Sequence, residues 1–126
     1  MERFARILIA EDDAEMRALL REWLEDEEYV VEEVTDGVEL VERIAHSWLG
    51  EGHALPPSLI ISDVRMPGFN GLSVLSALHR IDGTVPCIVI TAFGDAEVHE
   101  RAEGIGALAV LDKPVDRAHF LSVVAR

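Results

Sequence analysis

The sequence has little cysteine and no long apolar run. Its only cysteine, Cys87, lies in an apolar strand pattern and cannot form an internal disulfide. No apolar stretch among the 126 residues approaches the roughly 20 that span a bilayer, and Glu2 and Arg3 run straight into the first apolar run without a leader pattern. These absences predict a chain that works in a reducing cytoplasm without a membrane partner.

Basic residues are scarce as well. The chain has 24 acids against 11 bases and a formal net charge of −13, which repels nucleic acid, so we expect this domain to bind no DNA or RNA. The five histidines lie far apart, and with one cysteine they give no zinc pattern. The glycine-rich nucleotide-binding motifs G-x-x-x-x-G-K-[ST] and G-x-G-x-x-G are absent too.

Apolar residues are plentiful, and their spacing alternates between two periods. They make up 49% of the sequence, which at this length predicts one compact domain over residues 1–126, with no output domain in the chain. We expect strands at 6–10, 29–34, 58–62, 86–91 and 107–111, and helices at 16–24, 38–48, 72–81, 95–103 and 116–124. Asp13 is placed to cap the first helix, and the loop at 50–57 is too rich in glycine and proline to be helical.

Strands that alternate with helices predict an α/β fold, a doubly wound five-stranded parallel sheet with helices on both faces. Such sheets carry their functional residues beyond the carboxyl ends of the strands. Here those positions hold Glu11 and Asp12, Asp63, Thr91, and Lys113. Three carboxylates and one lysine balance in charge only when a divalent cation is present, and carboxylate oxygens suit Mg²⁺. We therefore expect a magnesium site at this edge.

Four motifs occur in a fixed order at these strand ends. They are I-L-I-A-E-D-D from residue 7, S-D-V-R-M-P-G-F-N-G from residue 62, I-V-I-T-A from residue 88, and L-D-K-P from residue 111. Together they resemble the receiver domain of bacterial two-component response regulators over essentially the whole chain, 7–124. The arginine that the family usually carries five residues after the second acid is Arg17. The resemblance implies a flavodoxin-like single domain with strand order 2-1-3-4-5.

The resemblance also implies a role for each residue at the strand ends. Asp63 would accept a phosphoryl group from a sensor histidine kinase or a phosphotransfer protein. The Mg²⁺ ligands would be Asp12, Asp63 and the backbone carbonyl of Arg65, with Glu11 acting through a water. Lys113, Thr91 and the backbone N–H of Ala92 would bind the phosphoryl group, and the Lys113–Pro114 bond would be cis. The domain would be a self-catalysed phosphoacceptor switch rather than an enzyme with a diffusible substrate.

Phosphorylation would then change the surface formed by the fourth helix, the fifth strand and the fifth helix, which the resemblance also offers as a homodimer contact. Receivers commonly carry Tyr or Phe three residues before the lysine, where this chain has Val110. We therefore expect the signal to rely on Thr91 and on backbone movement of residues 92–98, with Val110 keeping one rotamer. D-V-R-M-P-G-F-N-G-L and T-A-F-G-D are similar to receivers of transcriptional activators.

Two alternatives remain open at this point. One is a degenerate receiver that binds a partner without phosphorylation. The other is a metal-dependent phosphatase on a related sheet, which would carry a second aspartate two residues after the nucleophile, where this chain has Arg65.

Overall fold

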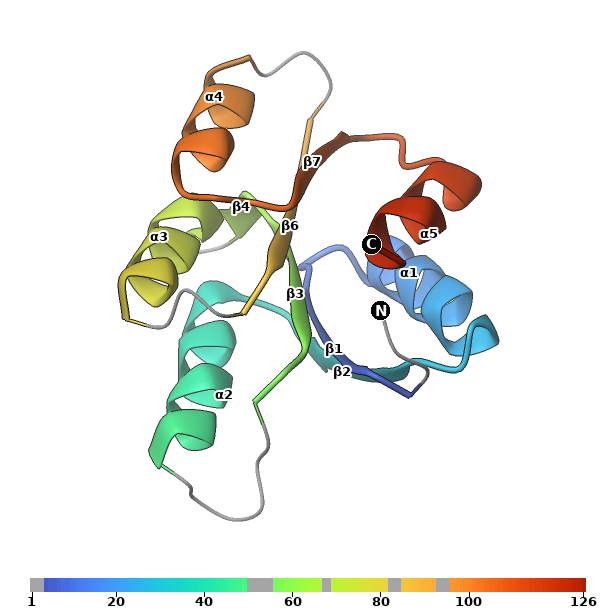
Figure 1. Ribbon diagram of the computed structural model, residues 1–126, viewed down its shortest axis with the longest axis horizontal. Coiled ribbons are helices and arrows are strands. Elements are labelled where there is room, and N and C mark those ends of the chain that lie inside the picture. The colour runs from blue at the N-terminus through green and yellow to red at the C-terminus, as the bar shows by residue number, and fades with distance from the viewer. Residues whose placement is uncertain (1–3, 50–55, 67–68, 82–84, 93–95) are drawn as a thin grey trace.

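The computed structural model describes residues 4–49, 56–66, 69–81, 85–92 and 96–126 (Figure 1). The strands are β1 (Arg6–Ala10), β2 (Val30–Val34), β3 (Leu59–Asp63), β4 (Arg65–Met66), β5 (Phe69–Asn70), β6 (Cys87–Thr91) and β7 (Ala109–Asp112). The helices are α1 (Ala14–Asp26), α2 (Gly37–Leu49), α3 (Gly71–Ile81), α4 (Ala96–Gly104) and α5 (Arg117–Val124). Most of the loop expected at 50–57 lies outside the described residues.

The main sheet confirms the predicted fold class. Its five strands are parallel and lie in the order β2-β1-β3-β6-β7, which is the order 2-1-3-4-5 when these strands are counted along the chain. Helices α2, α3 and α4 cover one face and α1 and α5 cover the other (Figure 1). Because the strands are parallel, the residues that follow β1, β3, β6 and β7 meet at one edge.

The sheet separates two apolar clusters. Leu8, Ile60 and Val89 point into the cluster under α2, α3 and α4, whereas Ile9, Ile61 and Ile90 point into the cluster under α1 and α5. β3 and β6 are buried along their whole lengths, as expected for strands covered on both faces. Trp23 of α1 and Phe120 of α5 pack together with ring centroids 5.9 Å apart, so this tryptophan belongs to the core contact between the two helices.

Side-chain oxygens accept hydrogen bonds from backbone N–H groups at the starts of several helices. Asp13 accepts hydrogen bonds from the backbone N–H groups of Glu15 and Met16, so the predicted cap of α1 is confirmed. Asp116 accepts from the N–H of His119 and caps α5 in the same way. Among the described residues, no helix has the length and apolarity needed to cross a bilayer.

The sequence prediction was wrong in some details. Apolar spacing of three and four residues predicts that Leu19 in α1 and Val38 and Val41 in α2 face the core, but 40–47% of their surface is exposed. A stripe at three- and four-residue spacing spans more of a helix than the part that meets a sheet. The short antiparallel pair of β4 and β5 was not predicted at all, since two-residue strands carry no periodicity.

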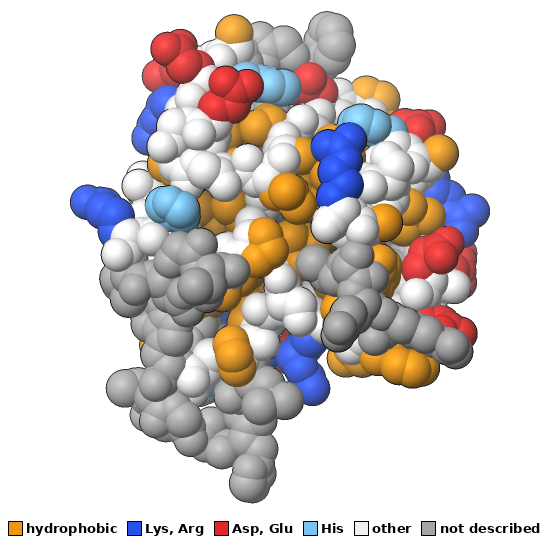
Figure 2. Space-filling view, in the orientation of Figure 1, with side chains coloured by type: hydrophobic (Ala, Val, Ile, Leu, Met, Phe, Trp, Pro, Cys, Tyr) orange, Lys and Arg blue, Asp and Glu red, His pale blue; other side chains and the backbone are white. Residues whose placement is uncertain are grey.

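Figure 2 shows the face of the molecule seen in Figure 1, where hydrophobic side chains gather at the centre and most acidic ones lie toward the rim. A cavity of about 180 Å³ opens among residues that end α3 and precede or begin β6 and β7. These residues lie at the amino ends of the strands, so this hollow is at the edge opposite the acids.

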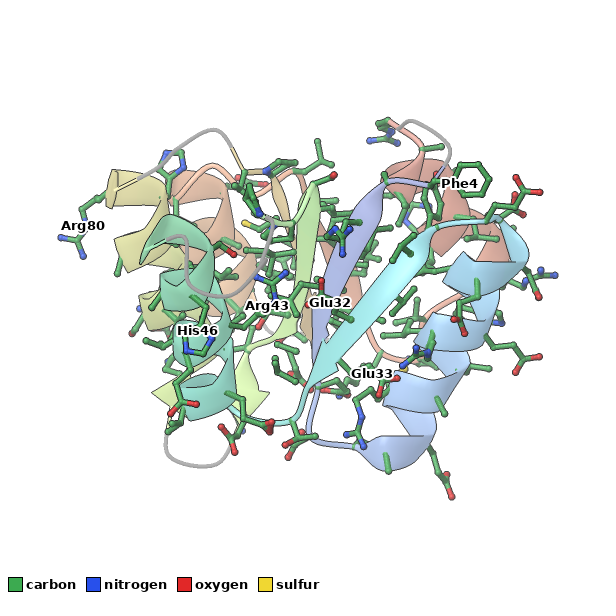
Figure 3. The ribbon with its side chains drawn as sticks, turned by 90° about the horizontal axis from the view of Figure 1, so that it is seen from below. Phe4, Glu32, Glu33, Arg43, His46 and Arg80 are labelled. Atoms are coloured by element: carbon green, nitrogen blue, oxygen red, sulfur yellow. The ribbon has the colours of Figure 1, made fainter. Side chains whose placement is uncertain are left out.

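The edge strand β2 is held on both of its faces by ion pairs (Figure 3). On the α2 side, Glu32 accepts from Arg43 Nη2 at 2.8 Å and from Arg6 Nη1 at 3.3 Å. On the α1 side, Glu33 lies 3.2 Å from Arg21 Nη1. Charged residues on an edge strand discourage pairing with other chains, and here they also fasten the strand to its helices.

The Glu32 pairs predict a pH-dependent stability. Hydrogen bonds from Arg43 outweigh partial burial and lower the pKa of Glu32. The contribution of Glu32 to the free energy of unfolding is therefore complete at pH values well above its unfolded-chain pKa of about 4.3. It is lost as the pH falls through the lower pKa of the folded state. Glu32→Gln should therefore reduce the free energy of unfolding by about 1 kcal/mol at neutral pH and by much less in acid. Urea unfolding checks this, with Glu42→Gln at an exposed position of α2 as control; equal losses at both pH values would contradict it.

Candidate functional site at the carboxyl ends of the strands

The predicted strand-end residues meet at one edge of the sheet. Glu11 and Asp12 follow β1, Asp63 ends β3, Thr91 ends β6, and Lys113 follows β7. Glu11, Asp63 and Thr91 are buried, with exposed fractions of 2%, 7% and 3%, whereas Asp12 is exposed. The site is therefore a row of buried polar groups with one carboxylate open to solvent.

Lys113 holds the two buried carboxylates together. Its Nζ donates to Asp63 Oδ2 at 2.7 Å and to Glu11 Oε1 at 3.0 Å, across sequence separations of 50 and 102 residues. Burial opposes the charge of Lys113, but both carboxylates outweigh it and raise its pKa. The lysine therefore stays protonated and neutralises part of the negative charge.

The two buried carboxylates differ in their affinity for a proton. Burial, reinforced by the neighbouring Asp63, raises the pKa of Glu11 from 4.5 to about 8, against the opposing effect of Lys113. Burial acts in the same direction on Asp63, but Glu11 beside it and hydrogen bonds from Lys113 and the Arg65 N–H outweigh burial and lower the pKa of Asp63. Asp63 is therefore the buried carboxylate that is ionised at neutral pH.

The acids fit a divalent cation. Glu11, Asp12 and Asp63 each offer one carboxylate oxygen, and these oxygens lie within 4.8 Å of one another. Among the described residues, Glu11 Oε2 is the only buried side-chain nitrogen or oxygen without a hydrogen-bond partner. Opposite ligands of an octahedral Mg²⁺ are about 4 Å apart, and the ion commonly keeps several waters. The orphaned oxygen and the close carboxylates match a site that takes one ion with some ligands through water.

The remaining predicted residues border this cluster. Thr91 pairs with Asp112 in the sheet register, and its carbonyl accepts from the backbone N–H of Lys113 at 2.8 Å. Ala92 follows at an exposed position. The Lys113–Pro114 peptide bond is cis, as the resemblance implied.

Local backbone contacts shape the segment after Asp63. The N–H of Arg65 donates to Asp63 Oδ1 at 3.2 Å, and the N–H of Gly71 donates to the Val64 carbonyl at 2.7 Å. Asn70 Oδ1 accepts from the Leu72 N–H and so begins α3. A Cβ atom on Gly71 would lie only 2.3 Å from the Asp63 carbonyl oxygen, so glycine is required for this close approach.

Two contacts near the site were not predicted from the sequence. Arg17 Nη1 donates to the backbone carbonyl of Glu11 at 2.9 Å, whereas the resemblance identified Arg17 only by its position five residues after Asp12. His99 Nε2 lies 2.8 Å from Asp112 Oδ1, which ties α4 to the end of β7 directly before Lys113. No short sequence motif predicts either contact, because each depends on how a helix packs against the sheet.

Comparisons with known proteins agree with this geometry. A family model described as the response regulator receiver domain matches residues 7–125. The transcriptional regulatory protein PdtaR of Mycobacterium tuberculosis is 44% identical over 122 residues, which are 94% of this chain and 54% of that protein. The chain thus spans about half the length of PdtaR.

Two further matches cover most of the chain that each is compared with. The chemotaxis protein CheY of Halobacterium salinarum is 28% identical over 120 residues, which are 95% of this chain and 93% of that protein. The structure of the non-phosphorylated HemR receiver domain from Leptospira biflexa has a TM-score of 0.80 and 28% identity, and covers 97% of this chain and 92% of that one.

The tight approach at Gly71 predicts the result of an alanine substitution there. Gly71→Ala should lower the free energy of unfolding by about 2 kcal/mol, because a backbone oxygen has to move away from the new methyl group. Gly104→Ala is the control: nothing lies within 4 Å of its Cβ position at the end of α4, and a gain of about 0.5–1 kcal/mol is expected. Urea unfolding measures both; a Gly71→Ala protein as stable as wild type would contradict the close contact.

Proposed function

This chain belongs to the response regulator receiver family, whose members typically interact with histidine kinases, and we propose that it accepts a phosphoryl group on Asp63 from a sensor histidine kinase or a phosphotransfer protein. The observation that carries the proposal is the pair of hydrogen bonds from Lys113 to Asp63 and Glu11. They gather a nucleophilic carboxylate, a cation-binding acid and a fixed positive charge in one place.

The transfer requires a carboxylate oxygen that is ionised and accessible at the moment of attack. An oxygen of Asp63 forms a bond to phosphorus, and the phosphorus–nitrogen bond of the donor phosphohistidine breaks with its electron pair going to the leaving imidazole. The product is an acyl phosphate. Lys113 can leave Glu11 for the new phosphoryl oxygens without leaving the site, because its side chain is about one-third exposed. Thr91 and the N–H of Ala92 supply further donors.

In this proposal Mg²⁺ would be held directly by Asp12, Asp63 and the Arg65 carbonyl, and through a water by Glu11. Bound there, the ion supplies neutralisation of charge on the transferring phosphoryl oxygens. The support from this chain is its own: three carboxylate oxygens within 4.8 Å of one another and one buried oxygen without a partner among the described residues.

The output surface in this proposal is the face of α4, β7 and α5. The His99–Asp112 contact supports it, because it links α4 to the residue that precedes Lys113 and pairs with Thr91. A change at Thr91 or Lys113 therefore acts on α4 through one contact. The same face is the proposed contact of a homodimer.

We extend the proposal to the place of the chain in a signalling system. Residues 1–126 form the receiver, which binds no nucleic acid itself and acts in the cytoplasm. PdtaR is a transcriptional regulatory protein about twice as long as its match to this chain, and control of transcription is the output proposed here.

Phosphorylation of the protein tests the proposal. Incubated with acetyl phosphate and Mg²⁺, wild type should gain one phosphoryl group by intact mass, and Asp63→Asn should gain none because the nucleophile is gone. Asp13→Asn is the matched control, since asparagine also caps a helix and the site is untouched; it should be phosphorylated like wild type. A wild-type protein that stays unmodified while folded would instead favour a phosphorylation-independent interaction module.

The aliphatic residue at position 110 makes the switch testable separately. Val110 is partly buried beside the core under α4, and we expect it to keep one χ1 rotamer while the amides of α4 and β7 change. Three-bond couplings of Val110 and amide hydrogen exchange, measured with and without beryllofluoride and Mg²⁺, check both points. Two rotamers of Val110 in the two states would refute a switch without side-chain rotation.

A further inference from the structure

Arg17 contacts the backbone of the acid site rather than its carboxylates. It closes the first turn of α1, its side chain is 18% exposed, and its Nη1 donates to the Glu11 carbonyl at 2.9 Å. Its Nε lies 3.7 Å from Glu33 Oε2 on β2. The guanidinium therefore joins three segments: the start of α1, the edge strand, and the corner where the chain leaves β1.

The carbonyl that Arg17 holds belongs to the peptide unit between Glu11 and Asp12. A peptide unit is planar and contains the Cα atoms of both residues, so holding its oxygen restrains the positions from which both acid side chains leave the backbone. The preceding peptide unit is fixed as well, because the Glu11 N–H donates to the Val34 carbonyl at 3.2 Å. Glu11 is thus held on both sides, by β2 through its nitrogen and by Arg17 through its oxygen.

We propose that Arg17 is a positioning residue for the magnesium site, which fixes Glu11 and Asp12 in the arrangement that binds the ion. This inference rests on the proposed function, because it concerns the same acids. Residues that orient ligands from outside the ligand set commonly contribute ten- to a hundredfold to metal affinity. A single hydrogen bond to one carbonyl belongs at the lower end of that range.

Charge and position predict opposite effects at this residue. Arg17 carries a positive charge next to the acids, and like charges repel, so its removal would by charge alone tighten Mg²⁺ binding. If Arg17 positions the acids, its removal weakens binding. Arg21 offers a control for the charge: its Nη1 lies 3.2 Å from the same Glu33 carboxylate, and its contacts are with Glu33 and Glu25 rather than with Glu11.

The experiment is a calorimetric titration of the folded protein with MgCl₂. Arg17→Met keeps the apolar stem of the side chain and should raise the Mg²⁺ dissociation constant about tenfold. Arg21→Met should leave it unchanged or lower it. Arg17→Lys can still donate to the Glu11 carbonyl and should recover most of the affinity. Cooperative unfolding is checked first for each variant, and Arg17→Gln with Arg21→Gln replaces any methionine variant that does not fold.

Each outcome separates the two proposals. Arg17→Met binding as tightly as wild type, or more tightly, overturns the positioning role while leaving the proposed function intact. Equal weakening in the Arg17 and Arg21 variants also overturns it, because the effect would then come through Glu33. A folded wild type that binds no Mg²⁺ defeats the proposed function and this inference with it.

Discussion

The site depends on one lysine placed between two buried carboxylates. Burying Glu11 and Asp63 side by side is costly, and the cost is met by Lys113, which donates to both. The balance is incomplete, because Glu11 keeps a raised pKa and a buried oxygen without a partner among the described residues. An incomplete balance of this kind favours a cation, and it explains why a strand buried in the core ends in acids.

The fold keeps these groups together although they are far apart in sequence. Parallel pairing brings the ends of β1, β3 and β7 to one edge, and specific contacts then fix each end. Arg17 and Val34 hold Glu11, the N–H of Arg65 holds Asp63, and the Thr91 carbonyl holds the backbone of Lys113. The same contacts reach outward to α1 and β2, and through Asp112 and His99 to α4. A change of charge at the site would therefore act on α1, β2 and α4 through these contacts.

Periodicity predicted the strands, and parallel topology predicted that Asp63 and Lys113 meet at one edge. The strand order itself came from the resemblance to receiver domains. The sequence did not predict the Arg17 contact with a backbone carbonyl or the His99–Asp112 contact. Both contacts depend on how a helix is rotated about its own axis against the sheet. Apolar spacing identifies only a broad buried face of the helix and does not determine that rotation. That same uncertainty placed Leu19 and Val38 in the core, whereas the structure exposes them. The β4–β5 pair is too short for any periodic signal.

We propose that Glu11, Asp12, Asp63 and Lys113 form one site for Mg²⁺ and a phosphoryl group. A crystal structure of the protein with Mg²⁺ and beryllofluoride, which mimics a phosphoryl group on a carboxylate, is the decisive test. We expect one magnesium ion among the three acids, beryllofluoride on Asp63, and the Nζ of Lys113 turned from Glu11 to a fluorine. Density for the ion away from these acids, or an unmodified Asp63 beside an unmoved Lys113, would contradict it.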